Sequence, residues 1–127
     1  MLPYQHALHT LLWSETDDNG DPLDGVDAEP SPELVQRIRD DWERFSDAAE
    51  AMGFDAEEHR LGPINSAEGD CWDYAAHDFI LTRNRHGTGF WDSGRWCAPW
   101  GQRLTDLAHS FGEINCYVGG DGLIYGE

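Results

Sequence analysis

The segment His77–Gly94 holds the densest set of side chains that could carry out chemistry. It contains Arg83, His86 and Asp92. In an enzyme, the histidine would transfer protons, the aspartate would orient the histidine, and the arginine would hold an anionic group. No nucleophile elbow, phosphate-binding loop or HExxH metal motif accompanies them. The alternative is structural, because arginine, asparagine and aspartate beside glycines commonly bond to the backbone of a turn.

Two short strands joined by a turn are predicted to position these side chains. In residues 78–83, Phe79 and Leu81 alternate with residues of the opposite face, which is the period of a strand. Residues 84–89 then turn the chain, since their glycines can adopt positive φ, and residues 90–92 return as the second strand. We expect Arg83 and Asp92 to bond each other or the turn backbone. The residues predicted to build this hairpin are Asp78, Arg83, Asn84, Gly87, Gly89, Trp91 and Asp92.

Length and composition predict one folded domain spanning residues 1–127. Apolar residues make up 39% of the chain, which is too many for a disordered protein. No apolar run is long enough to cross a bilayer, and the first residues lack the pattern of a secretion signal, so a cytoplasmic location is expected. The three cysteines form no CxxC pair and favour reduced thiols over disulfides or zinc. No cofactor is predicted.

The charge of the chain is strongly negative and unevenly distributed. The 25 acids face only 8 bases, all of them arginines, for a net charge of -17. Residues 1–78 hold 20 of the acids and four of the arginines. This asymmetry favours a localised negative surface that repels nucleic acid and membranes and attracts basic proteins. Adaptation of the whole chain to high salt is the competing interpretation.

A turn-rich acidic segment, residues 14–30, provides one part of this charge. The spacing of Asp17, Asn19 and Asp21 is similar to that of a calcium-binding loop. That loop requires glycine at its sixth position and glutamate at its twelfth, where this chain has Pro22 and Ala28. We therefore interpret the segment as a solvated acidic loop and predict no metal.

An amphipathic helix is predicted to follow directly. Ser31 can cap it, Pro32 suits its first turn, and apolar residues recur at spacings of three and four as far as Met52, before Gly53 ends it. The opposite face is rich in carboxylates. Together with the acidic loop, it predicts a surface for a basic partner. The residues of this predicted partner-binding surface are Asp17, Asp18, Asp21, Asp24, Asp40, Glu43, Asp47 and Glu50.

The remaining pattern completes the predicted fold. Residues 3–13 alternate weakly and are read as a strand, a second amphipathic helix begins near Pro99, and residues 114–125 form a hairpin around a glycine-rich turn. This order predicts an α+β fold with an antiparallel sheet of about five strands and two amphipathic helices packed on one face. The core expected between helices and sheet comprises Trp42, Phe45, Leu104, Leu107 and Phe111.

Several segments resemble a family of small acidic proteins of bacteriophages and other mobile DNA, a family without a settled activity. The resemblance covers LWSETDDNGDPLD and HDFILTRNRHGTGFWDSG, followed by QRLTDLAHSFG and YVGGDGLIYG, or roughly two thirds of the chain. This chain departs from the family pattern at Ile80, where tryptophan is usual, and at Arg85, where glycine is usual. Residues 60–75 look inserted. Arg85 argues against a tight type I′ turn at that position.

The resemblance implies a function, because small acidic phage proteins often occupy the nucleic-acid sites of host enzymes. It favours a non-enzymatic protein that binds a basic, nucleic-acid-binding host protein and inhibits host defence, as a DNA mimic, an anti-CRISPR or an antirestriction protein. Nucleic acid itself and membranes are not expected partners. The alternatives are an enzyme that uses Arg83, His86 and Asp92, and a phage structural component whose acidity is a high-salt adaptation. The sequence indicates no oligomeric state.

Overall fold

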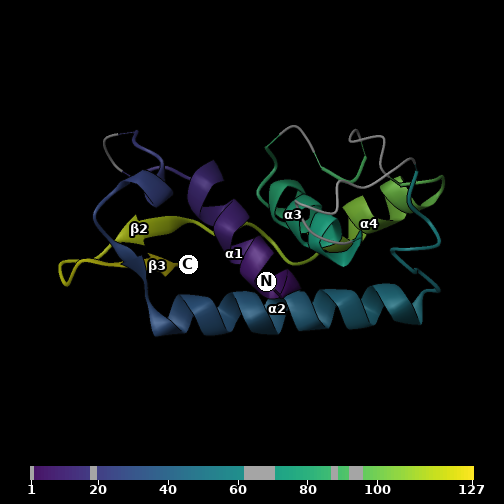
Figure 1. Ribbon diagram of the computed structural model, residues 1–127, viewed down its shortest axis with the longest axis horizontal. Helices are drawn as coiled ribbons and strands as arrows, with labels where there is room; N and C mark the ends of the chain where they lie inside the picture. The colour runs from purple at the N-terminus through teal and green to yellow at the C-terminus, as the bar shows by residue number, and fades with distance from the viewer. Residues whose placement is uncertain (1, 18–19, 62–70, 87–88, 92–95) are drawn as a thin grey trace.

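The computed structural model describes residues 2–17, 20–61, 71–86, 89–91 and 96–127. These residues form four α-helices, one short 3-10 helix and a three-stranded sheet. In Figure 1, α2 runs along the lower edge, the strands lie at one end, α3 and α4 lie at the other, and α1 crosses between them. In chain order the elements are α1 (Pro3–Ser14), η1 (Leu23–Gly25), β1 (Glu29–Pro30), α2 (Pro32–Ala51), α3 (Cys71–Arg83), α4 (Trp100–His109), β2 (Cys116–Val118) and β3 (Leu123–Gly126).

The predicted strand at residues 3–13 is wrong, because this segment is helix α1. Its buried residues are Ala7, Thr10 and Leu11, which lie three and four positions apart and so share one helical face. Pro3 occupies the first turn, where its missing N–H leaves no intrahelical bond unmade. The weak alternation of the sequence therefore came from a helix with one narrow buried stripe.

The predicted strand at residues 78–83 is also wrong, since these residues are the second half of helix α3. Every residue from Asp78 to Arg83 is buried. A helix enclosed on all sides presents no polar face, so its sequence lacks the amphipathic period by which helices are recognised. The predicted return strand at residues 90–92 is not present at Phe90 and Trp91, and Asp92 lies outside the described residues.

The two predicted amphipathic helices are present as α2 and α4, but the described chain has four α-helices rather than two. The Ser31 side chain caps α2 by accepting a hydrogen bond from the Leu34 backbone N–H at 3.0 Å. At the other end, Gly53 takes a φ of +101°, a left-handed conformation that favours glycine. Capping, proline position and apolar spacing thus agree with one another over this helix.

The sheet differs from the predicted antiparallel one. The C-terminal hairpin is present as β2 and β3, but the third strand is β1, which pairs with β3 in parallel. The strand order is β1-β3-β2, so the described sheet is mixed and has three strands rather than about five. Three predicted strands are missing: two of these segments form α1 and part of α3, and Phe90 and Trp91 form no strand. The correct part of the prediction is the mixture of helices and sheet.

An aromatic cluster forms the centre of the core. The rings of Phe45 and Phe79 stack with their centroids 4.4 Å apart, and Phe90 stacks on Phe45 at 5.5 Å. Trp42, Phe45 and Leu104 are buried as predicted, whereas Leu107 and Phe111 pack against the core and remain partly exposed. Across the described residues, no helix combines the length and apolarity needed to cross a membrane.

Candidate functional site

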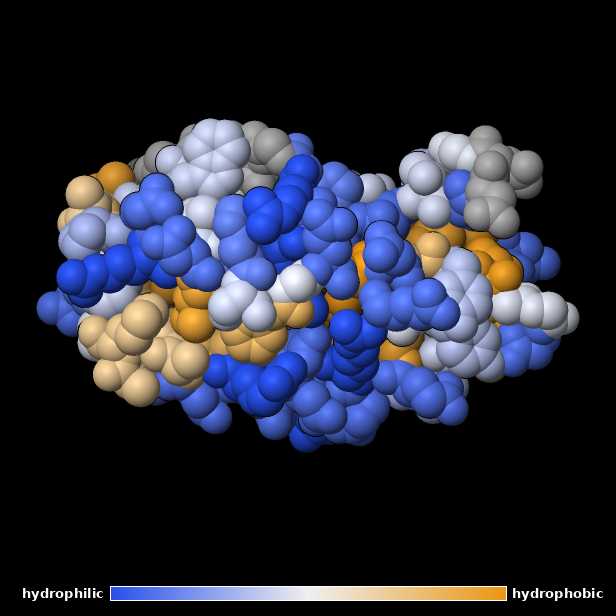
Figure 2. Space-filling model, turned by 180° about the vertical axis from the view of Figure 1, so that it is seen from behind, coloured by the Kyte–Doolittle hydropathy of each residue, from blue (hydrophilic) through white to orange (hydrophobic). Residues whose placement is uncertain are grey.

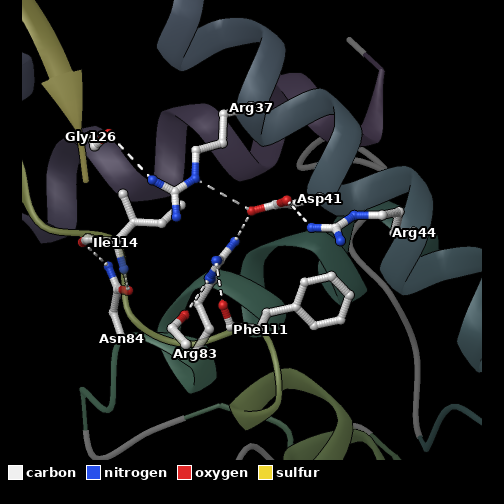
Figure 3. A network of polar contacts seen from close by, with 9 residues as sticks. Arg37, Asp41, Arg44, Arg83, Asn84, Phe111, Ile114 and Gly126 are labelled. Carbon is white, nitrogen blue, oxygen red and sulfur yellow. Dashed lines mark hydrogen bonds and ion pairs between the residues drawn. The ribbon is translucent and has the colours of Figure 1, made fainter.

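Arg83, the last residue of α3, is the centre of a buried polar network. Figure 3 shows its side chain reaching from the end of α3 toward α2. Its Nη1 donates to Asp41 Oδ2 at 2.8 Å, its Nε to the Gly112 carbonyl at 2.9 Å and its Nη2 to the Phe111 carbonyl at 3.2 Å. The Arg83 side chain is 0% exposed. This one guanidinium therefore joins α2, α3 and the segment that follows α4.

The Asp41 carboxylate is surrounded by three guanidinium groups. Besides Arg83, Arg44 Nη2 donates to Asp41 Oδ1, and Arg37 Nε lies 3.8 Å from Asp41 Oδ2. Arg37 also donates to the Gly126 carbonyl at 3.3 Å and so connects the network to β3. Burial lowers the pKa of Arg83, and the hydrogen bond and charge of Asp41 oppose that shift. The network is thus an internal tie between helices and sheet.

This geometry bears on the enzyme hypothesis. The Arg83 guanidinium exposes no surface and faces protein oxygens on α2 and in the segment after α4, so it offers nothing to an anionic substrate. His86 Nε2 lies 2.9 Å from Glu15 Oε1, beside the end of α1, whereas the Arg83 guanidinium bonds to other partners. Asp92 lies outside the described residues. The structure does not bring Arg83 and His86 together as an acid-base site.

The Asn84 amide joins three separate parts of the chain. Its Nδ2 donates to Glu15 Oε1 at 2.9 Å and to the Ile114 carbonyl at 3.2 Å. Its Oδ1 accepts the Ile114 backbone N–H at 2.8 Å. The side chain therefore holds the end of α1 and the start of the C-terminal hairpin against the end of α3.

The residue that follows Asn84 explains how α3 ends. The Arg85 N–H bonds to the Thr82 carbonyl and the His86 N–H to the Leu81 carbonyl, the pair of bonds that defines a Schellman motif. This motif places Arg85 in the left-handed region, with φ of +56°. The predicted hairpin tip is therefore wrong: the chain turns here at the end of a helix. Glycine suits the position best because it has no Cβ.

The other predicted motif residues lie in and around the core. Asp78 is buried and accepts a hydrogen bond from Trp96 Nε1 at 2.8 Å. Gly89 has a φ of +146°, and a Cβ there would lie 2.0 Å from Thr82 Oγ1, so the residue supplies both positive φ and close approach. Trp91 is 52% exposed. Gly87 lies outside the described residues.

The carboxylates predicted on α2 lie on its outer face. We call Asp40, Glu43, Asp47 and Glu50 the acidic row; all four are exposed. Seen from behind in Figure 2, hydrophilic residues cover most of the lower edge, along which α2 runs. An open groove of about 870 Å³ follows this helix. Its lining residues are Pro32, Glu33, Gln36, Arg37, Asp40, Asp41, Glu43, Arg44 and Asp47.

The predicted acidic loop lies elsewhere. Figure 1 places residues 15–17 and 20–28 above the strands at one end of the molecule, whereas α2 runs along the opposite edge. Asp17 Oδ1 accepts the Asp21 backbone N–H at 3.0 Å and so helps to close the loop, while Asp21 and Asp24 are exposed. Asp18 lies outside the described residues. The predicted surface is therefore divided between two edges of the molecule.

Metal-ligating and nucleophilic side chains are dispersed. Among the described residues, no three histidine, cysteine or carboxylate side chains come together in a way that could hold a metal ion. The three cysteines are thiols and do not form disulfides with one another. Burial, with the nearby charge of Glu15, raises the pKa of Cys116 to about 12, so this thiol is protonated at neutral pH and is a weak nucleophile.

Sequence reasoning missed Asp41, which organises the network. The signal was available: Asp41 lies three residues after Ile38 and four before Phe45, a spacing that puts it beside the apolar stripe. Its neighbour Asp40 lies on the acidic row. Glu15, which contacts Asn84 and His86, carried no comparable signal, because both partners are distant in sequence.

Comparison with known proteins adds no family to this description: no family model, curated protein or solved structure matches the chain.

Proposed function

We propose that the protein is a non-enzymatic binding protein whose acidic row on α2 binds a basic, nucleic-acid-handling protein of a host cell. The single observation that carries the proposal is the exposure of these four carboxylates along one helix, three of them lining an open groove. In the resembling class of phage proteins, such contacts would inhibit host defence, as anti-CRISPR or antirestriction proteins do.

The spacing of the row supports charge mimicry over a short distance. From Asp40 to Glu50 a helix rises about 15 Å, which gives about one carboxylate per 5 Å at 1.5 Å per residue. One strand of duplex DNA carries a phosphate about every 3.4 Å. The row is thus a sparser version of one backbone strand. Because the acidic loop lies on another edge, the proposed DNA-like contact is confined to α2 and its groove.

The neighbouring arginines favour this use of the row. Arg44 and Arg37 point toward Asp41, the former by a hydrogen bond and the latter as an ion pair. Among the described residues, the acidic row takes part in one ion pair, between Arg39 Nε and Glu43 Oε1 at 3.4 Å, and both side chains are exposed. Such a pair contributes little in water and can be exchanged for a partner's cation. Most of the row is therefore available to an arriving basic surface.

The experiment compares two fourfold variants with equal change in charge. One replaces Asp40, Glu43, Asp47 and Glu50 by their amides. The matched control does the same to four exposed acids away from α2, namely Glu57, Glu58, Asp106 and Glu113. The partner is first captured from host lysate with the wild-type protein and identified by mass spectrometry. It is then titrated against each form at two salt concentrations.

We expect the α2 variant to bind at least about tenfold more weakly at low salt, mainly through slower association, and to show a smaller salt dependence. No single amide should have this effect, since an exposed ion pair at 4 Å contributes about 1 kcal/mol in water. The control variant should bind within about twofold of wild type. Equal affinity and equal salt dependence for all three forms would contradict the proposal and favour general adaptation to high salt.

A further inference from the structure

β2 is an outer strand, and alternate residues along it direct their backbone groups away from the sheet. Asn115 and Glu127 exchange both N–H to carbonyl bonds, at 3.1 and 2.9 Å. In an antiparallel ladder, bonded and non-bonded pairs alternate. Tyr117, opposite Tyr125, therefore directs its backbone toward β3, whereas Ile114, Cys116 and Val118 direct theirs outward.

The first of these three outward positions is covered. Both backbone groups of Ile114 bond to the Asn84 side-chain amide, which takes the place that a residue of a fourth strand would occupy. Within the described parts of the chain, no hydrogen bond reaches the backbone N–H or C=O of Cys116 or Val118. We call these four groups the β2 edge. Tyr117 and Val118 are 43% and 40% exposed and Cys116 is partly exposed, so this strand lies at the protein surface.

Unpaired strand edges bind extended chains by main-chain hydrogen bonds. The charge around the β2 edge indicates which kind of chain. Residues 15–29 carry seven acids and no base. Glu15 lies at the covered end, bonded to the same Asn84 amide that bonds Ile114, and its charge acts on the Cys116 thiol. Asp121 lies in the turn at the other end of the hairpin.

A second copy of this chain fits the edge poorly. Pairing two β2 strands would bring together two chains that each carry a net charge of -17, with their acidic segments at the same interface. A segment with lysine or arginine would instead be attracted by the negative charge around the edge. Tyr117 also offers such a segment an exposed ring, already stacked on Tyr125 with centroids 5.7 Å apart, on which an arginine opposite it can lie.

We propose that the β2 edge binds an extended, arginine- or lysine-bearing segment of a partner protein, which adds to the sheet as a fourth strand beside Cys116–Val118. This contact is separate from the acidic row on α2. The proposed contact depends on the proposed function only for the basic character of the partner. In addition, it specifies that part of the partner adopts an extended conformation.

The probe is a synthetic peptide, acetyl-Arg-Val-Arg-Val-Arg-amide, compared with the same peptide carrying N-methyl groups on both valines. In the added strand, the valines face Cys116 and Val118 and the central arginine faces Tyr117. Both peptides have the same charge, but only the first can donate hydrogen bonds from its valines to the edge. We expect the first to bind and the methylated one, which lacks both donors, to bind at least about fivefold more weakly, the factor expected from the loss of even one hydrogen bond.

Amide hydrogen exchange by nuclear magnetic resonance locates the contact. Without peptide, the Cys116 and Val118 amides should exchange quickly and the Tyr117 amide, bonded to β3, slowly. With the first peptide, Cys116 and Val118 should become protected. Protection that instead appears on raising the protein concentration alone would show that a second copy occupies the edge, and would overturn the proposal.

Two variants at one position complete the test. Val118→Pro removes an N–H that points outward and leaves the bonds to β3 in place, as proline on an edge strand can. Val118→Ala keeps the N–H. We expect the proline variant to lose peptide binding by at least about fivefold and the alanine variant to stay within about twofold. Equal binding by both variants, or by both peptides, overturns the proposal.

These outcomes are independent of the test of α2. The variant that lacks the acidic row should still protect Cys116 and Val118 in the presence of the peptide. If it alone loses peptide binding while Val118→Pro binds normally, the peptide is held by the charge of α2, so the edge proposal fails and the proposed function stands.

Discussion

Asp40 and Asp41 are neighbours on α2 and have opposite environments. Asp40 is exposed and lines the open groove. The Asp41 side chain is 7% exposed and pairs with the fully buried Arg83. Carboxylates that are adjacent in the sequence can therefore have different roles in the structure. One is available to a partner, while the other holds the helix against the remainder of the protein.

The largest difference between the two positions should appear in stability. Asp41→Asn leaves the Arg83 guanidinium buried without its counter-ion, so we expect the free energy of unfolding to fall by about 3 to 5 kcal/mol. Asp40→Asn should change it by less than about 0.5 kcal/mol. Urea unfolding followed by circular dichroism measures both. Similar values for the two variants would show that the network contributes no more than a surface charge.

A smaller effect is expected at the end of α3, where Arg85 occupies the left-handed position with φ of +56°. Arg85→Gly should raise the free energy of unfolding by about 1 kcal/mol, because glycine adopts this conformation without a steric penalty. Arg85→Ala is the control, since it removes the exposed ion pair with Glu113 but keeps the Cβ. A gain for both variants would assign the effect to the side chain rather than to the backbone.

The smallest effect concerns the turn between β2 and β3. The hydrogen bond to Asp121 is the main cause that raises the pKa of Tyr125 to about 12. A tyrosine whose pKa is higher in the folded state adds stability that is complete below its unfolded pKa of about 10. This stability is lost as the pH rises through about 12. In the Asp121→Asn variant, the ionisation of Tyr125 should therefore occur at a lower pH than in the wild-type protein.

Tyrosinate absorbance in a Tyr117→Phe background measures this titration with less overlap from the stacked neighbour. The Asp121→Asn variant should ionise Tyr125 closer to its ordinary pKa. An unchanged titration would mean that the hydrogen bond from Tyr125 to Asp121 is not maintained in solution.

The elements predicted correctly are those whose local chemistry and burial agree. In α2, the Ser31 cap, the apolar stripe and the left-handed Gly53 all specify one helix. The C-terminal hairpin likewise follows from alternation around a glycine-rich turn. Such elements are half exposed, and their sequence records which side meets water.

The elements predicted wrongly are those that depend on the rest of the protein. α3 is enclosed, so Phe79 and Leu81 suggested a strand by chance. A usable signal was the absence of glycine and proline from Cys71 to His86, a length more typical of a helix than of a strand. The parallel pairing of β1 with β3 joins segments far apart in sequence, and the two residues of β1 carry no periodicity.

The candidate site was predictable only in part. The exposed acidic row follows from the helix period, and its residues lie where that period places them. The partners of Arg83 cannot be predicted from that period. Asp41 is 42 residues away in the chain, and the backbone carbonyls of Phe111 and Gly112 carry no side-chain signal. Because Arg83 precedes a glycine-rich segment, the sequence placed it at a turn. It is instead the most deeply buried cation in the described structure.

The ion pair between Arg83 and Asp41 also sets the rotation of α2 about its own axis. An apolar stripe tolerates some rolling of a helix, because neighbouring side chains can repack around it. The Arg83 guanidinium also bonds two backbone carbonyls, so it cannot move with a rotating α2. Its bond to Asp41 therefore opposes rotation of the helix about its axis. Each residue turns a helix by about 100°. With Asp41 fixed inward, the angular position of every carboxylate in the acidic row is fixed as well, so the proposed partner would meet the row at one orientation.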